Sequence, residues 1–464
     1  MTTLRRVISN RNCIGCGACA AAYPQSMSME LTSEGHWQAR SADDGYDPII
    51  DVAGASICPL SGASDDETRI AASLYPDLPH DDRIGRFRRN IVGHVVKNEF
   101  RSTGSSGGLL TWLLERLLAG GEVDAVLHVQ PLERSAGNDL LFGYRISRTS
   151  EQVRSGAKSR YYPIHMADVL KRLMREDGRY AVVGTPCFIK AVRLLERSGH
   201  IPEGRVRHAV GLVCGHLKSR YFGEYLAWQK GVPPQELAAI DFRRKLLDRK
   251  ASDYGFAFRQ EGSDVEKTFP MSSVHGRDWG EGLFKNPACE FCDDVLAECA
   301  DIAIGDAWLP GFVDDPEGTN VAVIRSAALD MIIEDAESKG DLLMTETDPE
   351  TIAKSQEPGL RHRRRGLMHR LARRRETGQW TPRKRVPPLL EARSSRRKIY
   401  DLRLRIAEES SKAFAQAREE GELDRFSADM AALLLAYQAA NKVNLVRRLV
   451  RSLRSLLRDR RKPT

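Results

Sequence analysis

Hydrophobic and polar positions alternate through the middle of the chain in a pattern that predicts helices and strands in turn. Apolar residues with helical periodicity occupy 107–120, 166–176, 188–199, 220–231 and 327–338. Short apolar runs typical of buried strands occupy 124–130, 179–184, 208–214, 300–306, 320–326 and 341–346. Strand–helix alternation of this kind predicts an α/β fold with a mixed, largely parallel sheet.

Composition divides the chain into four regions. Residues 1–60 contain many Cys and Gly residues and lack a long apolar periodicity, which predicts a small domain of their own. Residues 61–92 are polar, acidic and Pro-containing, which is typical of a linker. The alternating elements fill residues 93–358, with core elements to about residue 346. From residue 359 the chain is Arg-rich and helix-forming, so we predict a helical extension over 359–464.

The net charge of +8 is the sum of two unlike parts. Residues 361–464 hold 29 Lys and Arg against 11 Asp and Glu, a net charge of +18, which leaves −10 for the remainder. The chain is 41% hydrophobic and 29% charged, which excludes a disordered or fibrous protein. Its acidic body excludes a protein that is basic throughout, such as a compact nucleic-acid-binding domain.

The basic tail has a role that composition alone leaves open. Aromatic residues that would stack on bases are sparse in it, so nucleic acid is not an expected partner. In 442–458 apolar residues share one helical face and arginines the other, which suits peripheral contact with an anionic membrane or packing against helices expected at 402–440. Charge also allows the tail to dock on an acidic partner or on its own acidic body.

The compartment decides how the nine cysteines are interpreted. The opening MTTLRRVISNRNC lacks the apolar segment of a secretory signal, and no apolar run approaches the ~20 residues that span a bilayer. We therefore expect a cytoplasmic protein. Cysteines in that compartment favour metal or redox roles over disulfides.

Three cysteines at two-residue spacing begin the chain's chemistry, in CIGCGAC (13–19). Thiolates of Cys13, Cys16 and Cys19 on a tight Gly-containing loop can converge on three corners of an iron–sulfur cubane. The fourth Cys expected in a bacterial ferredoxin run is replaced by Tyr23-Pro24, and Cys58-Pro59 offers a substitute. We predict one 4Fe-4S cluster on these four cysteines, with a structural zinc site as the alternative.

The other cysteines are scattered. Cys187 and Cys214 each follow a predicted strand, where open α/β sheets bind ligands, and Cys289 and Cys292 form a paired knuckle. Four thiolates from three segments can make a second closed site, but buried free cysteines are also common at strand ends, and spacing leaves both interpretations open. Cys299 stands alone, and we expect it to be a core residue.

Ordered motifs over about residues 10–345 resemble the family of coenzyme F-420 hydrogenase/dehydrogenase beta subunits. That family also contains chlorophyllide vinyl reductase and hydroxymethyl chlorophyll reductase. The motifs that carry the resemblance are CIGCGAC (13–19), GSSGG (104–108), AKSRYYP (157–163), GRYAVVGTPC (178–187), GLVCGH (211–216), IDFRRK (240–245), PACEFC (287–292) and DIAIGDAW (301–308). The resemblance implies an iron–sulfur flavoprotein with FAD, and a second 4Fe-4S cluster on Cys187, Cys214, Cys289 and Cys292.

The resemblance also selects flavin-binding candidates. Read alone, GSSGG is an ordinary helix entry and 158–161 a solvated basic turn; with the resemblance they become contacts to a flavin phosphate or ring. Thr185 and Asp306 lie near the same strand ends, although Asp306 suits a turn or helix cap equally well. His216 is a candidate proton donor or a structural residue. The candidates for binding FAD are Ser105, Ser106, Gly107, Gly108, Lys158, Ser159, Arg160, Tyr161, Thr185 and Asp306.

These features predict an oxidoreductase. Electrons from ferredoxin or a redox partner subunit would pass through two 4Fe-4S clusters to FAD and a small organic substrate, or in the reverse direction. The alternative is a non-catalytic electron-transfer subunit that serves a partner enzyme, docked through the basic C-terminal helices. The sequence identifies neither the substrate nor the oligomeric state, and homo-oligomerisation stays open.

Overall fold

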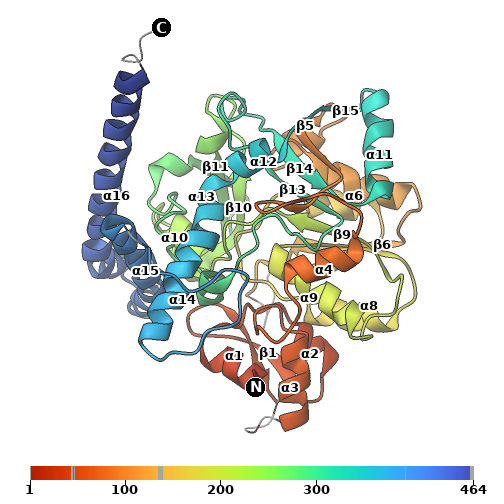
Figure 1. Ribbon diagram of the computed structural model, residues 1–464, viewed down its shortest axis with the longest axis horizontal. Helices are drawn as coiled ribbons and strands as arrows, with labels where there is room; N and C mark the ends of the chain where they lie inside the picture. The colour runs from red at the N-terminus through yellow and green to blue at the C-terminus, as the bar shows by residue number, and fades with distance from the viewer. Residues whose placement is uncertain (1, 43–44, 46, 134–138, 392, 460–464) are drawn as a thin grey trace.

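The computed structural model describes residues 2–459 apart from 43–44, 46, 134–138 and 392; from 443 to 459 it describes the helical backbone alone. A large sheet lies at the centre, the N-terminal elements cluster at one end, and the C-terminal helices run along one side (Figure 1). Among the described residues, no helix combines the length and apolar character needed to cross a bilayer.

Eight strands form the central sheet in the order β15-β5-β14-β13-β9-β8-β6-β7. The pairings β13–β9, β9–β8 and β8–β6 are parallel, and the other four are antiparallel. The predicted α/β fold with a mixed sheet is confirmed, but the predicted parallel majority is wrong, because no crossover helix separates β13 from β14. The strands are β5 (Arg89–Val95), β6 (Ala125–Pro131), β7 (Phe142–Ser147), β8 (Tyr180–Gly184), β9 (Val206–Leu212), β13 (Ile302–Asp306), β14 (Asn320–Ile324) and β15 (Leu342–Glu346).

Helices cover both faces of this sheet (Figure 1). Successive residues of β6 alternate between the two cores: Val126 packs with α6 and α11, whereas Leu127 packs with α8 and α9. Two-sided burial explains why the sequence shows these strands as continuous apolar runs. The helices around the sheet are α5 (Phe100–Thr103), α6 (Leu109–Ala119), α7 (Ser150–Ser155), α8 (Ala167–Arg175), α9 (Pro186–Arg197), α10 (Tyr221–Trp228) and α11 (Ala327–Ser338).

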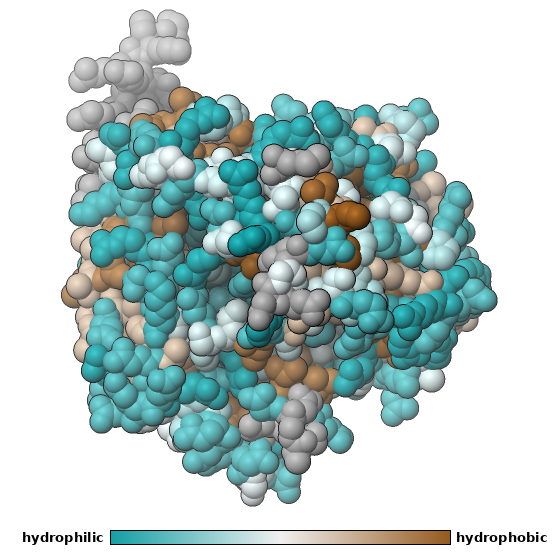
Figure 2. All heavy atoms as spheres, turned by 90° about the horizontal axis from the view of Figure 1, so that it is seen from below, coloured by the Kyte–Doolittle hydropathy of each residue, from teal (hydrophilic) through white to brown (hydrophobic). Residues whose placement is uncertain are grey.

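The N-terminal region packs beneath the sheet. It contains α1 (Leu4–Ser9), α2 (Ala18–Ala22), β1 (Met27–Leu31), β2 (Trp37–Ser41) and α3 (Pro48–Ser56), with β1 and β2 antiparallel. The backbone N–H of Arg5 donates to the buried carboxylate of Asp51, which ties α1 to α3. Polar side chains cover most of the face on this side, with small separate apolar patches (Figure 2).

Residues 61–92, which composition favours as a linker, are packed against the body. They form α4 (Glu67–Leu74), the short antiparallel pair β3 (His80–Asp81) and β4 (Gly85–Arg86), and the start of β5. Ile70 and Ile84 are fully buried in the core that α8 and α9 also line. Two apolar residues at wide spacing were too few to reveal this packing in the sequence.

A second, three-stranded antiparallel sheet also lay outside the predicted elements. It consists of β10 (Leu237–Arg244), β11 (Gly255–Gln260) and β12 (Glu266–Pro270). Its aromatic side chains Phe242, Phe256 and Phe258 are buried in a core shared with α10. The sheet carries Arg243, the last residue but one of β10, to Asp306 of β13 in the central sheet.

The C-terminal extension begins as a nearly continuous helical run and ends as a helical hairpin. Phe414 and Phe426 of the hairpin pack against Tyr225 of α10, with ring centroids 6.0 and 4.9 Å from it. The amphipathic segment 442–458 lies outside the residues whose side chains are described, apart from Lys442. The helix that precedes the extension is α12 (Pro349–Ser355). The elements that follow are α13 (Glu357–Arg361), a π-helical turn (His362–Gly366), α14 (Leu367–Glu376), α15 (Ser394–Glu420) and α16 (Leu423–Asp459).

Candidate functional site

The first cysteine group consists of Cys13, Cys16, Cys19 and Cys58, which the fold brings together in the N-terminal region. Cys13 and Cys16 precede α2, Cys19 lies within it, and Cys58 follows α3. Burial raises the pKa of Cys58 to about 11. Burial also raises the pKa of Cys19, and the charges of the other three thiolates raise it further. A cationic cluster or metal ion bound by the four thiolates would relieve their mutual repulsion.

The loop that carries these thiols depends on two glycines. Gly15 and Gly17 have φ angles of +72° and +85°. A Cβ on Gly15 would lie 2.5 Å from the carbonyl oxygen of Trp37, and one on Gly17 would lie 2.7 Å from the Ala167 nitrogen. Both the left-handed backbone and the close packing therefore require glycine.

The second cysteine group consists of Cys187, Cys214, Cys289 and Cys292. Cys187 is in the first turn of α9, Cys214 follows β9, and the other two belong to the 3-10 segment Pro287–Phe291 and its end. Burial raises the pKa of Cys187 well above its ordinary value, and the charges of the other three thiolates raise it further. The Leu217 N–H donates to the Cys289 Sγ at 3.3 Å.

Cys299 lies apart from this group. It is fully buried in the main core, and the charges that raise its pKa after burial are those of Glu67, Asp294 and Glu298. These surroundings agree with the expected core position.

Tyr144 connects the two cysteine groups electrostatically. Burial raises the pKa of its hydroxyl, and the charges of Cys187 and Cys16 raise it further. The hydroxyl, which donates to the Val183 carbonyl at 3.0 Å, therefore lies within electrostatic reach of one thiol from each group.

Among the described residues, no three His, Cys, Asp or Glu side chains converge as the ligands of a single metal ion do.

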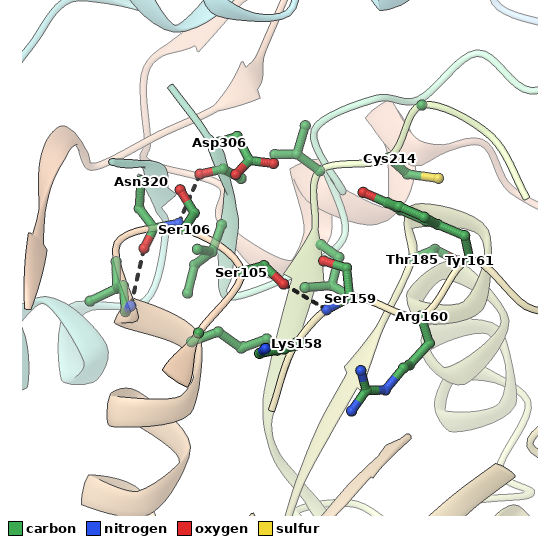
Figure 3. Close-up of a pocket in the computed structure, with 18 of the residues that line it drawn as sticks. Ser105, Ser106, Lys158, Ser159, Arg160, Tyr161, Thr185, Cys214, Asp306 and Asn320 are labelled. Carbon is green, nitrogen blue, oxygen red and sulfur yellow. Dashed lines mark hydrogen bonds between the residues drawn. The ribbon is translucent and has the colours of Figure 1, made fainter. Parts of the chain in front are cut away.

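A cavity of about 180 Å³ lies at the strand ends of the central sheet and brings nearly all the predicted flavin contacts together. It is walled by the entry to α6, the segment 158–162 and the ends of β9 and β13 (Figure 3). The predicted residues that line it are Ser105, Ser106, Gly108, Lys158, Ser159, Arg160, Tyr161, Thr185, His216 and Asp306. Cys214 of the second cysteine group lines the same cavity.

Gly107 is a predicted flavin contact that does not line the cavity, and its role in the structure is packing. A Cβ there would lie 2.8 Å from the Gly93 carbonyl oxygen and 2.9 Å from the Asn320 nitrogen, so glycine lets the α6 entry press against β5 and β14. The Asn320 side chain accepts a hydrogen bond from the Leu109 N–H at 3.1 Å. The amide of Leu109 at the helix entry is therefore already satisfied and is not free to bind an anion.

The segment 158–161 is held in a strained shape beside the α6 entry. Lys158 has a φ of +79°, a conformation that costs a non-glycine residue about 1–3 kcal/mol and is typical of functional sites. Its Nζ lies 2.6 Å from the Asp241 carboxylate, and the Ser159 N–H donates to the Ser105 hydroxyl at 2.7 Å. These contacts hold a cation and a hydroxyl at the cavity wall.

Arg243 is the organising residue that sequence reasoning missed. Its guanidinium, almost fully buried, donates to both Asp306 carboxylate oxygens at 3.0 and 3.1 Å. It also donates to the Ser105 carbonyl at 2.9 Å and to the Tyr161 hydroxyl at 3.2 Å. The motif IDFRRK (240–245) was the only signal for it, and the motif gave no role to the arginine.

Unpartnered polar atoms in the cavity wall fit a bound polar ligand. Nε of Arg160 and Nε2 of His216 are buried and have no hydrogen-bond partner among the described residues. The His216 ring lies 4.6 Å from the Trp279 ring, and burial lowers the pKa of His216 well below its ordinary value. Cations, hydroxyls and aromatic rings around one cavity form a donor set that suits a flavin.

Lys218, which lines the cavity, makes the free energy of unfolding of the protein depend on pH. Burial, followed by the charge of Lys285, lowers the pKa of Lys218 to about 7. Between pH 7 and about 10 the unfolded chain binds a proton that folded Lys218 has released, so this residue makes the free energy of unfolding rise with pH, by at most ~1.4 kcal/mol per unit. Replacing Lys218 by Met should flatten that rise in urea denaturation curves measured across this range. A difference between wild type and variant that does not change with pH would contradict this.

Comparison with known proteins gives the family. Residues 90–171 and 177–350 match "Coenzyme F420 hydrogenase/dehydrogenase, beta subunit" N-term and C terminus, respectively. The coenzyme F420 hydrogenase subunit beta of Methanothermobacter thermautotrophicus is 21% identical over 62% of this chain and 91% of its own length. An F(420)H(2) dehydrogenase subunit of Methanosarcina mazei is 22% identical over 50% of this chain and 58% of its own.

A solved structure of the F420-reducing [NiFe] hydrogenase complex from Methanosarcina barkeri contains a chain that covers 64% of this one and 96% of itself, at 17% identity and a TM-score of 0.48. The two matched ranges fill more than half of the sequence and include the central cavity and the second cysteine group. The chain belongs to the family of coenzyme F420 hydrogenase/dehydrogenase beta subunits.

Proposed function

We propose that the protein is an iron–sulfur flavoprotein oxidoreductase that moves electrons between a ferredoxin-like donor and a small organic substrate. Each cysteine group would hold one 4Fe-4S cluster, the first within a ferredoxin-like domain of residues 1–60. FAD would occupy the central cavity of residues 93–358. Clusters exchange single electrons, whereas a flavin exchanges two and can transfer a hydride.

The observation that carries this proposal is the position of Cys214. It belongs to the second cysteine group and also lines the central cavity, so one residue joins the two sites. Tyr144, which the charges of Cys187 and Cys16 both affect, links the second group to the first. The proposed electron path would run from the first cysteine group through the second to the cavity.

The cavity residues would position the flavin and control its charge. Lys158 and Arg160 would offset negative charge on a phosphate or on the ring, and positive charge near a flavin raises its reduction potential. Arg243 would hold Tyr161 and Ser105 in place from behind. His216, neutral and with a free buried Nε2, would accept or donate one hydrogen bond at the cavity wall.

Anaerobic purification with iron, sulfide and flavin analysis tests this proposal. We expect about eight irons and one FAD per chain, since two cubane clusters hold four irons each. Cys58→Ser and Cys187→Ser should each remove about half of the iron, because each removes one ligand from a different group. Cys299→Ser is the matched control and should keep the full iron content. Zinc without iron, or an unchanged iron content in either ligand variant, would refute the assignment.

A second candidate function is favoured by the names of the relatives, which are subunits of hydrogenases or dehydrogenases. In this case the chain would pass electrons to a partner subunit that holds the substrate. Flavin content and turnover separate the two candidates. An enzyme should contain FAD and reduce an added acceptor alone, whereas a relay would show cluster signals without flavin.

A further inference from the structure

A π-helical turn interrupts the helical run Glu357–Glu376 at the start of the C-terminal extension. The wider turn places two successive side chains, His362 and Arg363, against the body, where they are 7% and 2% exposed. Single π-helical turns inside helices are frequent at functional sites. This turn lies beyond the range that matches the family, which ends at residue 350.

Arg363 lies directly against the second cysteine group. One Nη donates to the Gly215 carbonyl at 2.6 Å and the other donates to the Asp294 carbonyl. These two carbonyls follow Cys214 and Cys292 closely in the chain. Burial raises the pKa of the Cys214 thiol, and the charge of the guanidinium lowers it. The guanidinium stays charged beside these cysteines, because arginine is not deprotonated in proteins.

The same helical run clamps the segment that carries the last two cysteines. Glu290, between Cys289 and Cys292, is 3% exposed, and its carboxylate lies 3.0 Å from Arg370 Nε. His362 Nε2 lies 3.4 Å from the same carboxylate oxygen, and the buried ammonium of Lys285 pairs with the other oxygen. The extension therefore fixes both the geometry of the cysteine segment and the position of the arginine beside it.

We propose that Arg363 is a positioning residue that sets the reduction potential of the cluster held by the second cysteine group. This inference rests on the proposed function. The reduced cluster carries one more negative charge than the oxidised cluster, and a fixed, buried positive charge beside its thiolates stabilises the reduced form more. A charge from the basic extension thereby adjusts the potential of one cluster in the electron path.

Anaerobic redox titration followed by EPR tests this inference on the full-length protein. We expect Arg363→Gln to shift the potential of one cluster to more negative values, to leave the other cluster unchanged, and to keep the iron content. Arg361→Gln is the matched control, since Arg361 lies on the same helical run but pairs at 2.8 Å with the exposed Glu357. Its two potentials should equal those of the wild type.

The outcomes decide the inference separately from the proposed function, on which the wild-type iron content reports. Full iron content with unchanged potentials in Arg363→Gln would overturn the inference. If Arg363→Gln loses half of the iron, Arg363→Lys decides: iron retained by the lysine variant shows that the site requires the positive charge. Loss of half of the iron in both variants would show a purely structural role for the arginine and would also overturn the inference.

Discussion

Replacing Arg243 by Met is expected to destabilise the protein by about 3–5 kcal/mol and to abolish retention of the FAD proposed for the central cavity. The substitution removes four hydrogen bonds, to both oxygens of Asp306, to the Ser105 carbonyl and to the Tyr161 hydroxyl. It leaves the Asp306 carboxylate without its cation in a largely buried cavity wall. Urea denaturation and the flavin-to-protein absorbance ratio measure the two effects.

The neighbouring arginine supplies the control for this prediction. Arg244 lies next in β10 but is 35% exposed; it pairs with Glu266 on the surface and lies 3.5 Å from Asp241, which keeps Lys158 as its closer cation at 2.6 Å. Arg244→Gln should cost less than about 1 kcal/mol and keep the flavin, because exposed ion pairs contribute little. The double variant Arg243→Met, Asp306→Asn should recover part of the stability lost in Arg243→Met, since it removes the uncompensated charge. Wild-type stability and flavin content in Arg243→Met would contradict the assigned role.

Periodicity predicted the parallel centre of the fold because those elements are buried on two sides. Strands β8 and β9 appear in the sequence as apolar runs, and α9 shows helical spacing, within two residues of the observed bounds. Residues 61–92 were missed because their few buried side chains are separated by polar residues. The β10–β12 sheet was missed because the longest buried run in its strands, residues 255–258, is short. The local pattern of a segment shows which of its residues face the core and which face water. It does not show the contacts that an isolated buried residue makes.

The sequence indicated the thiols and the cavity loops for a different reason. Cysteine spacing and the small residues of GSSGG carry their chemistry in the residue type, so they can be recognised before folding. Arg243 and Arg363 do not, since an arginine in a polar segment is most often solvated. Their burial depends on partners that lie 63 and 69 residues away, namely Asp306 and the Asp294 carbonyl.

The structure explains why an acidic body and a basic extension occur in one chain. The acidic body offers buried carboxylates, and the basic extension supplies their cations. Lys384 pairs with Asp293 at 3.3 Å, with both side chains 4% exposed, and Arg385 bridges Asp293 and Glu298. At least this part of the extension docks on the chain's own body, one of the alternatives that charge had left open.

A chain ending at Gln356 is therefore expected to lose the fold around the second cysteine group. Glu290 would keep only the Lys285 cation, and Asp293 would lose both Lys384 and Arg385. Removing both of these cations from Asp293 costs about 3–5 kcal/mol, and a whole domain is stable by only about 5–15 kcal/mol. The loss of Phe414 and Phe426 would also uncover the apolar face of α10.

Solubility, iron content and thermal unfolding of the chain ending at Gln356 measure this effect, and a chain ending at Lys442 is its control. The longer chain keeps every buried contact described for the extension, so its iron content and melting temperature should equal those of the full chain. The shorter chain should be insoluble or should lack at least half of the iron. Because it retains all eight candidate cysteine ligands and the whole range that matches the family, wild-type iron content in a soluble 1–356 chain would show that the body folds alone. The extension would then be the separable appendage that its composition had indicated.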